Sequence, residues 1–240
     1  MVKVDGYEVI DLTGDGVIRL VEAMTLAAGH LPRLNPSDLV KEQTRLTHYL
    51  HDRIAHRWER ILLDNASHLR QVVGEDVAFE RTPYLRIARS GMPEDNIGIH
   101  RDTHYGASPA EWVLWIPLTE AIDGAELRIL PGSWTEPEEA YPWTQEPSEV
   151  AKGSEKHWLG FLYAPKRMNA DTEARCIPIP CRVGQAILFN SASVHGQIVN
   201  TAPWTRVSMD IRLISESARI KSAAGVRGKH YQPLSLREAA

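Results

Sequence analysis

The sequence contains only two cysteines and no long apolar run, and both shortages limit what the protein can be. Cys176 and Cys181 are separated by four residues, and no second Cys/His pair lies nearby to complete a zinc site. Their odd spacing would place them on opposite faces of a regular strand, so we expect two free thiols. No stretch approaches the roughly 20 apolar residues that span a bilayer, and residues 1–6 lack the apolar core of a signal peptide. We therefore expect a cytoplasmic protein.

The chain also lacks an excess of charge of either sign. Its formal net charge of −4 gives no support for a nucleic-acid or membrane-surface partner. With 43% hydrophobic and 24% charged residues, the composition is that of an ordinary globular protein. We see no internal repeat and no low-complexity segment. The length of 240 residues therefore predicts a single domain over 1–240 with a sizeable core.

The first third of the chain has the pattern of helices. After a short extended segment at 7–12, we expect a helix over about Gly16–Ala28. A second helix start follows at Asn35, with proline in the first turn and Asp38 near the positive end of the helix. Near-helical apolar spacing then predicts one long helix that ends near Val73. We expect the histidines along it to lie on the helix surface rather than to bind metal; these are His48, His51, His56 and His68.

From about Val77 onward the pattern changes to short strands separated by Pro, Gly and Asp. The expected strands are Tyr84–Ala88, 112–118, 126–130, Gln185–Asn190 and 207–213. Helices followed by strands predict an α+β domain, in which residues 1–75 give mainly helical support and 76–214 form the β-core. Residues 134–175 form a long excursion of the kind that is often functional. The polar segment 215–240 is a tail, and the sequence leaves open whether it is a loose arm or an oligomer contact.

A pair of candidate metal ligands stands at His100 and Asp102. Side chains alternate across a β-strand, so these two would point to the same face, about 7 Å apart along the backbone. With a second histidine from far downstream they would hold Fe(II) on one triangular face and leave three adjacent positions open. The alternative is a polar turn with scattered histidines.

The second histidine is His195, which follows a predicted strand and precedes Gly196. Eleven positions later Arg206 begins a strictly alternating segment. Its polar positions are Arg206, Ser208, Asp210 and Arg212, and its apolar positions are Val207, Met209, Ile211 and Leu213. One interpretation is a one-sided sheet whose polar face meets water. The other is a barrel with a polar lumen, in which Arg206 offers its two-pronged donor to a carboxylate.

Together these motifs resemble those of the Fe(II)- and 2-oxoglutarate-dependent oxygenases, in particular the phytanoyl-CoA dioxygenase-like branch. The resemblance covers roughly residues 80–213, with the family's spacing between His195 and Arg206. Its motifs are the segment 100–105, Trp115, the segment 126–133 ending in Pro131-Gly132-Ser133, Phe189-Asn190, His195-Gly196, Asn200 and Arg206.

The resemblance implies a double-stranded β-helix, a jelly-roll or cupin-like core buttressed by the N-terminal helices. The implied Fe(II) ligands are His100, Asp102 and His195. Arg206 would pair with the distal carboxylate of 2-oxoglutarate, with Ser208 assisting it and Trp115 flanking the cosubstrate. With O2 as the oxidant, the implied reaction oxidises a C–H bond and releases succinate and CO2.

Three residues near the implied site are expected to face the substrate or its surroundings. Trp134 stands where the family often has histidine, and Gln197 where a smaller hydroxyl residue is common. In an unbroken strand His104 would share the face of His100 and compete as a ligand. We expect the strand to end near Asp102, which leaves His104 behind the ligands or facing the substrate.

The excursion interleaves carboxylates with aromatic rings, and Trp134 and Glu136 are its candidate substrate residues. It is either a solvated loop or a pocket wall, in which rings suit sugar faces and carboxylates suit ammonium groups. The chain also resembles oxygenases of aminoglycoside antibiotic pathways of the hygromycin or streptomycin type. We therefore expect hydroxylation or oxidative ring closure of a small molecule, a sugar or a cationic aminoglycoside or aminocyclitol. The alternatives are a cupin-type isomerase or lyase without 2-oxoglutarate, an oxygenase of a lipid or acyl substrate, and a non-catalytic binding protein.

Overall fold

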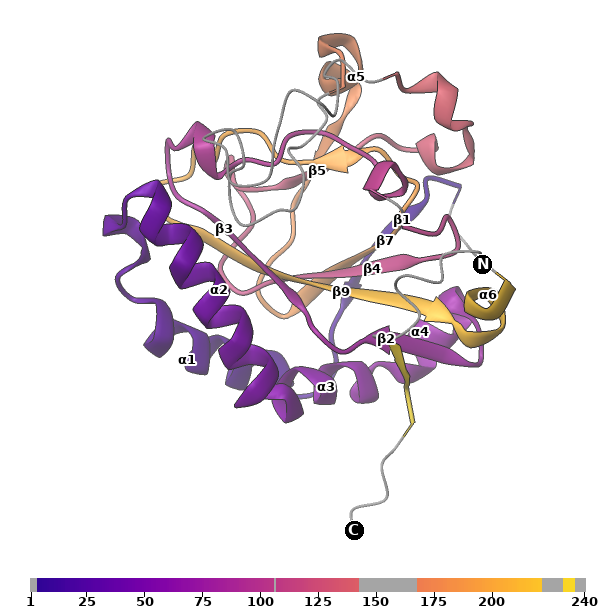
Figure 1. Cartoon of the computed structure of the whole chain (residues 1–240), viewed down its shortest axis with the longest axis horizontal. Helices are drawn as coiled ribbons and strands as arrows, with labels where there is room; N and C mark the ends of the chain where they lie inside the picture. Colours follow the sequence, from indigo (N-terminus) through magenta and orange to yellow (C-terminus); the bar gives the residue numbers. More distant parts are fainter. Residues whose placement is uncertain (1–3, 106, 143–167, 222–230, 236–240) are drawn as a thin grey trace.

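Two antiparallel β-sheets and a layer of helices make up the fold (Figure 1). The computed structural model describes residues 4–105, 107–142, 168–221 and 231–235. Within them the large sheet has the strand order β1-β7-β4-β9-β2-β10, and β3 pairs with the first half of β9. The small sheet has the order β6-β5-β8. This arrangement confirms the predicted double-stranded β-helix with helical support.

The strands fall close to their predicted positions. Those of the large sheet are β1 (Tyr7–Asp11), β2 (Val77–Glu80), β3 (Tyr84–Ala88), β4 (Trp112–Pro117), β7 (Gln185–Asn190), β9 (Arg206–Ser215) and β10 (Tyr231–Pro233). Those of the small sheet are β5 (Leu127–Ile129), β6 (Ile177–Ile179) and β8 (His195–Gly196). Prediction from alternation and turn residues therefore located every strand it named, with ends shifted by one or two residues.

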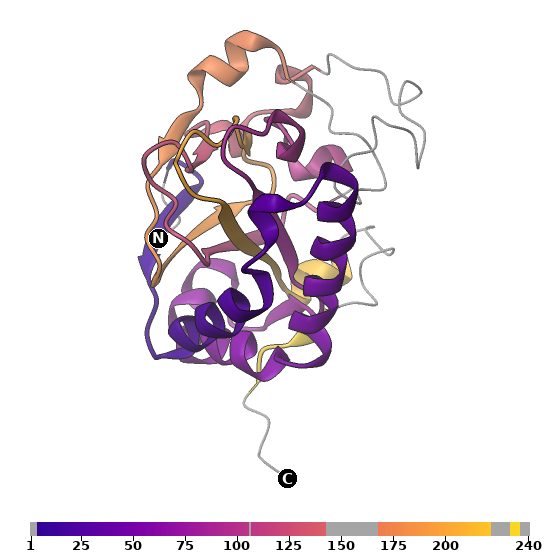
Figure 2. The same cartoon turned by 90° about the vertical axis from the view of Figure 1, so that its left-hand side faces the viewer.

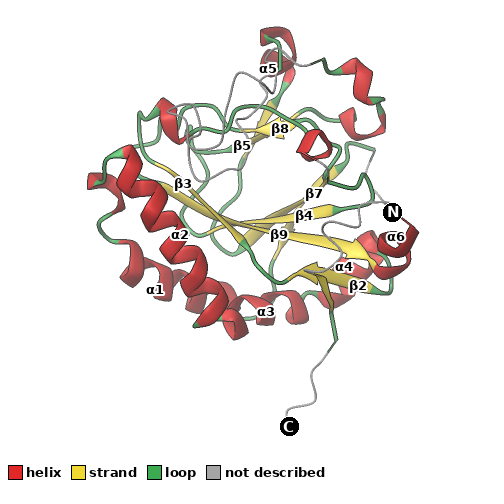
Figure 3. Cartoon of the chain, in the orientation of Figure 1, coloured by secondary structure: helices red, strands yellow, loops and turns green. Residues whose placement is uncertain are grey.

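The helices gather along one side of the large sheet, away from the small sheet (Figures 2 and 3). They are α1 (Gly16–Ala28), α2 (Pro36–Asp52), α3 (Ala55–Asp64) and α4 (Ala66–Val73), with the short α5 (Ala170–Arg175) and α6 (Glu216–Lys221) elsewhere. Apolar side chains of the first four helices share one core with the outward face of the large sheet, among them Leu46, Trp58, Ile61 and Leu69. No helix in the described ranges is both long and apolar enough to cross a membrane.

The single long helix predicted from Asn35 to Val73 is wrong. The segment is divided into α2, α3 and α4 by breaks at 53–54 and at Asn65. The Asn65 side chain donates to the carbonyl of Ile61 at 2.8 Å and accepts from the Thr13 backbone at 3.0 Å. Such side-chain bonds to the backbone compete with helical ones, so the chain turns here. The apolar spacing continues across both breaks because all three helices pack against the same sheet.

The two faces of β9 differ in chemistry, and both are buried. Val207, Met209, Ile211 and Leu213 belong to the core shared with the helices. Arg206, Ser208, Asp210 and Arg212 are 0–6% exposed, although they are polar or charged. The polar face therefore does not meet water. Of the two interpretations, the barrel with a polar lumen is confirmed.

Both ends of the chain contribute strands to the large sheet. Residues 7–11 pair with β7, so the N-terminal part supplies more than helices. Tyr231–Pro233, in the segment expected to be a loose arm or an oligomer contact, pairs with β2 as an edge strand. The two cysteines are free and buried, as expected from their spacing. Residues 143–167 of the excursion lie outside the described residues.

Candidate metal and cosubstrate site

The chain brings His100 and His195 directly opposite each other. Each backbone N–H donates to the other residue's carbonyl, at 2.7 and 2.8 Å, which makes an isolated antiparallel bridge. Gly196 permits this approach, because a Cβ there would lie 2.2 Å from the carbonyl oxygen of Gly98. The imidazole centroids are 4.5 Å apart. Two histidines 95 positions apart thus meet through backbone pairing.

Asp102 reaches the same point by a different local structure. It begins a 3-10 turn, Asp102–Tyr105, rather than continuing a strand, and its N–H donates to the carbonyl of Ser191 at 3.0 Å. Its carboxylate oxygens lie 3.6 Å from His100 Nε2 and 3.7 Å from His195 Nε2. The expected strand is reduced to the isolated bridge at His100, and no strand continues through Asp102.

The imidazoles are oriented for metal binding. His100 Nδ1 is 2.9 Å from the carbonyl of Gly98, and His195 Nδ1 is 2.9 Å from that of Ser193. A carbonyl only accepts, so both rings donate from Nδ1, which leaves Nε2 facing Asp102 and in position for a metal. Burial lowers the pKa of His195 to about 3, against the opposing charge of Asp102. This ring is therefore neutral near pH 7 and able to act as a ligand.

The three side chains fit a divalent metal ion. Their ligand atoms lie within 4.8 Å of one another, and all three residues are buried. Burial by itself raises the pKa of Asp102, but the charges of Arg212 and His195 and the hydrogen bonds from His100 and Arg212 together outweigh it and hold that pKa well below its usual range. Two neutral imidazoles and one ionised carboxylate are the donor set of non-haem Fe(II) oxygenases.

Arg206 offers unpaired donors to a second ligand. It is 2% exposed, and its Nη1 makes a long hydrogen bond of 3.4 Å to the carbonyl of Ala125. Its Nε and Nη2, and the hydroxyl of Ser208, have no hydrogen-bond partner among the described residues. The guanidinium lies 5.6 Å above the ring of Trp115. Burial lowers the pKa of Arg206 to about 10, so it stays charged near pH 7 and suits a carboxylate.

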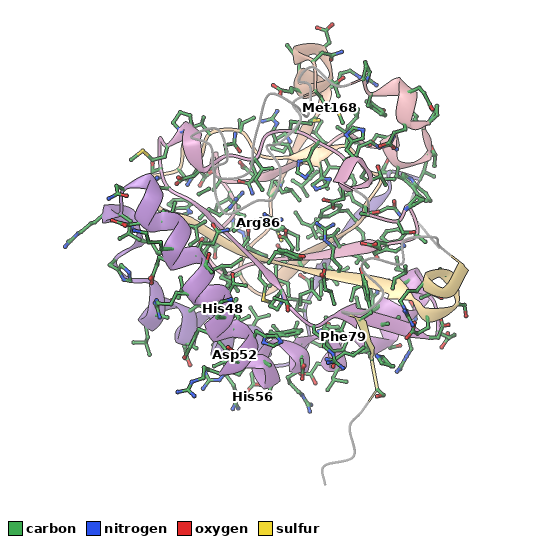
Figure 4. The ribbon with its side chains drawn as sticks, in the orientation of Figure 1. His48, Asp52, His56, Phe79, Arg86 and Met168 are labelled. Carbon is green, nitrogen blue, oxygen red and sulfur yellow. The ribbon has the colours of Figure 1, made fainter. Side chains whose placement is uncertain are left out.

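A small cavity lies beside the three candidate ligands, between the two sheets. It is lined by Arg86, Ile97, His100, Asp102, Val113, Trp115, Leu127, Phe189, His195, Gly196, Gln197, Asp210 and Arg212. Arg86, labelled in Figure 4, lies on β3 near the centre of the molecule. Its Nε donates to Asp210 at 2.9 Å. Gln197 lies at this cavity, as its sequence position predicted.

The structure does not place the other expected substrate residues at this cavity. Trp134 packs against Gly6, and its indole nitrogen is 3.3 Å from the carbonyl of Val4. Glu136 is exposed, and its carboxylate accepts from the hydroxyl of Tyr141. His104 Nε2 lies 3.0 Å from Glu138. None of the three is among the described residues that line the cavity, so their role towards the substrate stays a prediction. The Pro131–Ser133 turn directs Trp134 towards the N-terminal segment.

Three lumen residues were not singled out in the sequence as site residues: Arg86, Asp210 and Arg212. Alternation in β3 sets Arg86 against Leu85 and Ile87, which is a signal for the lumen face. Asp210 and Arg212 share the polar face of β9, but the sequence does not show what either contacts. The helix histidines lie apart from the cavity; His48 and His56 are in the helical layer in Figure 4. His68 pairs with Glu8 at 2.8 Å.

We expect Gly196→Ala to weaken metal binding, because the new Cβ would displace the backbone at Gly98 and separate His100 from His195. Overpacking of this kind costs roughly 1–3 kcal/mol of unfolding free energy. Chemical denaturation and a Co(II) titration measure both effects. Gly29→Ala is the matched control, since its Cβ would lie 3.8 Å from its nearest neighbour. Equal Co(II) affinity in both variants would contradict the role given to Gly196.

Comparison with known proteins agrees with this geometry. EvdO2 from Micromonospora carbonacea var. aurantiaca, complexed with 2-oxoglutarate, is 17% identical over 88% of this chain and 87% of its own, with a TM-score of 0.56. EctD from S. alaskensis, with 2-oxoglutarate and 5-hydroxyectoine, is 16% identical over 89% and 73%, with a TM-score of 0.54. The nickel complex of the non-heme monooxygenase ThoJ is 13% identical over 97% and 77%, with a TM-score of 0.52. At these identities the likeness concerns the fold.

No curated protein sequence matches the chain. The family model of phytanoyl-CoA dioxygenase (PhyH) matches residues 25–207, which include His100, Asp102, His195 and Arg206. This match covers most of the chain. The chain therefore belongs to the phytanoyl-CoA dioxygenase family and is an Fe(II)- and 2-oxoglutarate-dependent dioxygenase.

Proposed function

We propose that His100, Asp102 and His195 hold one Fe(II), that Arg206 and Ser208 bind the distal carboxylate of 2-oxoglutarate, and that the substrate is a small polar molecule. When bound, the iron with 2-oxoglutarate and O2 supplies the oxidation of an unactivated C–H bond, with release of succinate and CO2. The observation that carries the proposal is a buried, unpaired Arg206 in the same lumen as two histidines and a carboxylate.

Of the three lumen arginines described, Arg206 is the one suited to anchor the cosubstrate. Arg212 uses both terminal nitrogens on Asp102, and Arg86 donates its Nε to Asp210. The donors of Arg206 and Ser208 that lack partners need acceptors, and a carboxylate only accepts. A cupin-type isomerase or lyase without a 2-oxo acid would leave these donors unused.

The remaining lumen residues orient the reactants and exclude water. Trp115 lies under the Arg206 guanidinium and would flank the carbon chain of the cosubstrate. Val113, Leu127 and Phe189 line the cavity with apolar surface next to the candidate ligands. Such surface keeps bulk water from the reacting centre and strengthens the ion pairs within it.

Asp210 bears on the class of substrate. It is 6% exposed and lines the cavity, and its Oδ1 has no hydrogen-bond partner among the described residues. 2-Oxoglutarate, a dianion, has no hydrogen to donate to it. We propose that the substrate presents an O–H or N–H group there, in keeping with the sugar or aminocyclitol that the sequence predicts. An antibiotic pathway and ring closure stay predictions from the sequence.

A positive charge on the substrate has no support among the described residues. Glu136 and Glu138 have partners of their own outside the cavity, and Asp210 is paired with Arg86. The proposal therefore concerns hydrogen-bond donors rather than charge. An acyl or lipid substrate, the alternative prediction, would have no donor for Asp210 along its chain.

The metal assignment predicts a spectroscopic change. Anaerobic addition of Fe(II) and 2-oxoglutarate should give the weak visible charge-transfer band of a chelated 2-oxo acid. His195→Ala removes one of three ligands and should abolish the band. His48→Ala, a change in α2 away from the cavity, is the control and should retain it. An unchanged band in His195→Ala would refute the assignment.

The cosubstrate assignment predicts an affinity loss. Charge-assisted hydrogen bonds are worth roughly 1.5–3 kcal/mol each, so Arg206→Ala should weaken 2-oxoglutarate binding about 10- to 150-fold or more. Arg206→Lys should recover only part, because an ammonium lacks the planar fork. Titration of the same charge-transfer band measures each affinity. Equal affinity in all three proteins would rule out the anchoring role.

The substrate assignment predicts a preference among test compounds. Succinate release should be stimulated by cyclitols, amino sugars or other compounds with O–H or N–H groups. Capping the relevant donor as a methyl ether should lower kcat/KM by about 5- to 150-fold, the equivalent of roughly 1–3 kcal/mol for an unsatisfied buried acceptor. In Asp210→Ala, kcat/KM should differ less between the free compound and its methyl ether. The assignment would be overturned if the enzyme turned over an acyl compound without such donors and if Asp210→Ala distinguished the free compound from its methyl ether as strongly as the parent does.

A further inference from the structure

Arg212, on β9 of the large sheet, binds both oxygens of the Asp102 carboxylate. Its Nη2 donates to Oδ1 at 3.0 Å, and its Nη1 donates to Oδ2. Arg212 is 5% exposed and Asp102 is 6% exposed, so water takes little part in the contact. A planar guanidinium that holds both oxygens of a carboxylate fixes its rotation as well as its place.

The same two oxygens face the histidines. Oδ1 lies 3.6 Å from His100 Nε2, and Oδ2 lies 3.7 Å from His195 Nε2. The carboxylate is therefore shared between one guanidinium and two imidazoles. Its backbone is also held, because the Asp102 N–H donates to Ser191 at 3.0 Å. With the backbone and both oxygens fixed, the third ligand is in position before a metal arrives.

We propose that Arg212 is a positioning residue for the metal site, which orients the Asp102 carboxylate towards the two histidines. The inference rests on the proposed role of Asp102 as a ligand. It assigns different tasks to two arginines of one strand face: Arg206 binds the cosubstrate, and Arg212 holds the ligand. Arg212 already has both terminal nitrogens engaged, whereas Arg206 has two unpaired nitrogens.

Two effects of Arg212 on a metal oppose each other. Its positive charge repels a divalent cation, while its two hydrogen bonds hold the ligand in place. The carboxylate lies between the guanidinium and the imidazoles, and its orientation decides whether a third ligand is available. Residues that hold a metal ligand in this way typically contribute 10- to 100-fold to metal affinity. Positioning therefore outweighs repulsion.

The test is a titration of the purified metal-free protein with Co(II) alone, without 2-oxoglutarate. Arg212→Met should weaken Co(II) binding about 10- to 100-fold. Arg212→Lys keeps the charge but loses the two-pronged donor. Its Co(II) affinity should therefore lie between those of the parent and Arg212→Met. Arg206→Met is the matched control, a buried arginine on the same face of β9, and should bind Co(II) like the parent. It should instead weaken 2-oxoglutarate binding to the Co(II)-loaded protein.

The other results separate the competing explanations. Tighter Co(II) binding by Arg212→Met would mean that repulsion dominates, and unchanged Co(II) binding with weakened 2-oxoglutarate binding would make Arg212 a cosubstrate residue. Either outcome overturns the inference. Failure of the parent protein itself to bind Co(II), or equal binding by His195→Ala, would instead overturn the metal site.

A stability measurement keeps the inference testable if Arg212→Met folds poorly. Removing one partner of a buried ion pair leaves the other uncompensated, and removing both relieves that penalty. The metal-free double variant Arg212→Met with Asp102→Asn should therefore unfold at a higher temperature than Arg212→Met alone. If the double variant is no more stable, Arg212 acts by packing rather than through Asp102, and the inference is wrong.

Discussion

The burial of a charged strand face is the constraint on which the rest of this structure depends. β9 directs Arg206, Asp210 and Arg212 into the lumen, while its other face completes the core with the helices. An uncompensated buried charge costs several kcal/mol, so each must find a partner. Arg212 forms an ion pair with Asp102, and Asp210 forms one with Arg86. Arg206 has no comparable partner among the described residues, and this imbalance is what makes the lumen a site for an acidic ligand.

The segment that carries His100 and Asp102 is joined to the small sheet by a backbone junction. There His100 pairs with His195 of β8, and both rings turn towards Asp102. Arg101 reinforces the junction from the opposite side. Its buried guanidinium donates to the carbonyls of Ala192, Ser133 and Glu136, which come from two loops around the site. His100 and Asp102 thus face the lumen, while Arg101 between them holds the surrounding loops.

The site could be predicted from the sequence where side-chain chemistry and order were sufficient. His100, Asp102 and His195 converge as the donor types indicated, although Asp102 begins a 3-10 turn rather than lying in the expected strand. The resemblance assigned Arg206 to the cosubstrate, but the task of Arg212 could not be predicted. Arg206 and Arg212 share one face and one alternation, and only their partners in space distinguish them. The break between α3 and α4 at Asn65 was missed for a related reason. Apolar spacing indicates which side of a helix is buried, but it does not show whether the helix is continuous.

The glutamates after the Pro131–Ser133 turn show why composition alone does not assign a task. Their density suggested a wall that recognises a cation, but Glu138 lies 3.3 Å from buried Arg101 and 3.0 Å from His104. Its carboxylate compensates charge next to the candidate ligands and also accepts from Thr103. Of the described glutamates in this segment, Glu138 is therefore paired with the protein's own basic residues, and Glu136 with the hydroxyl of Tyr141. In the proposed function the substrate is recognised by Asp210, whose Oδ1 has no partner among the described residues and lies beside the candidate ligands in a lumen otherwise rich in donors. An acceptor in that position selects for the hydrogen that a substrate carries, and a dianionic cosubstrate cannot take its place.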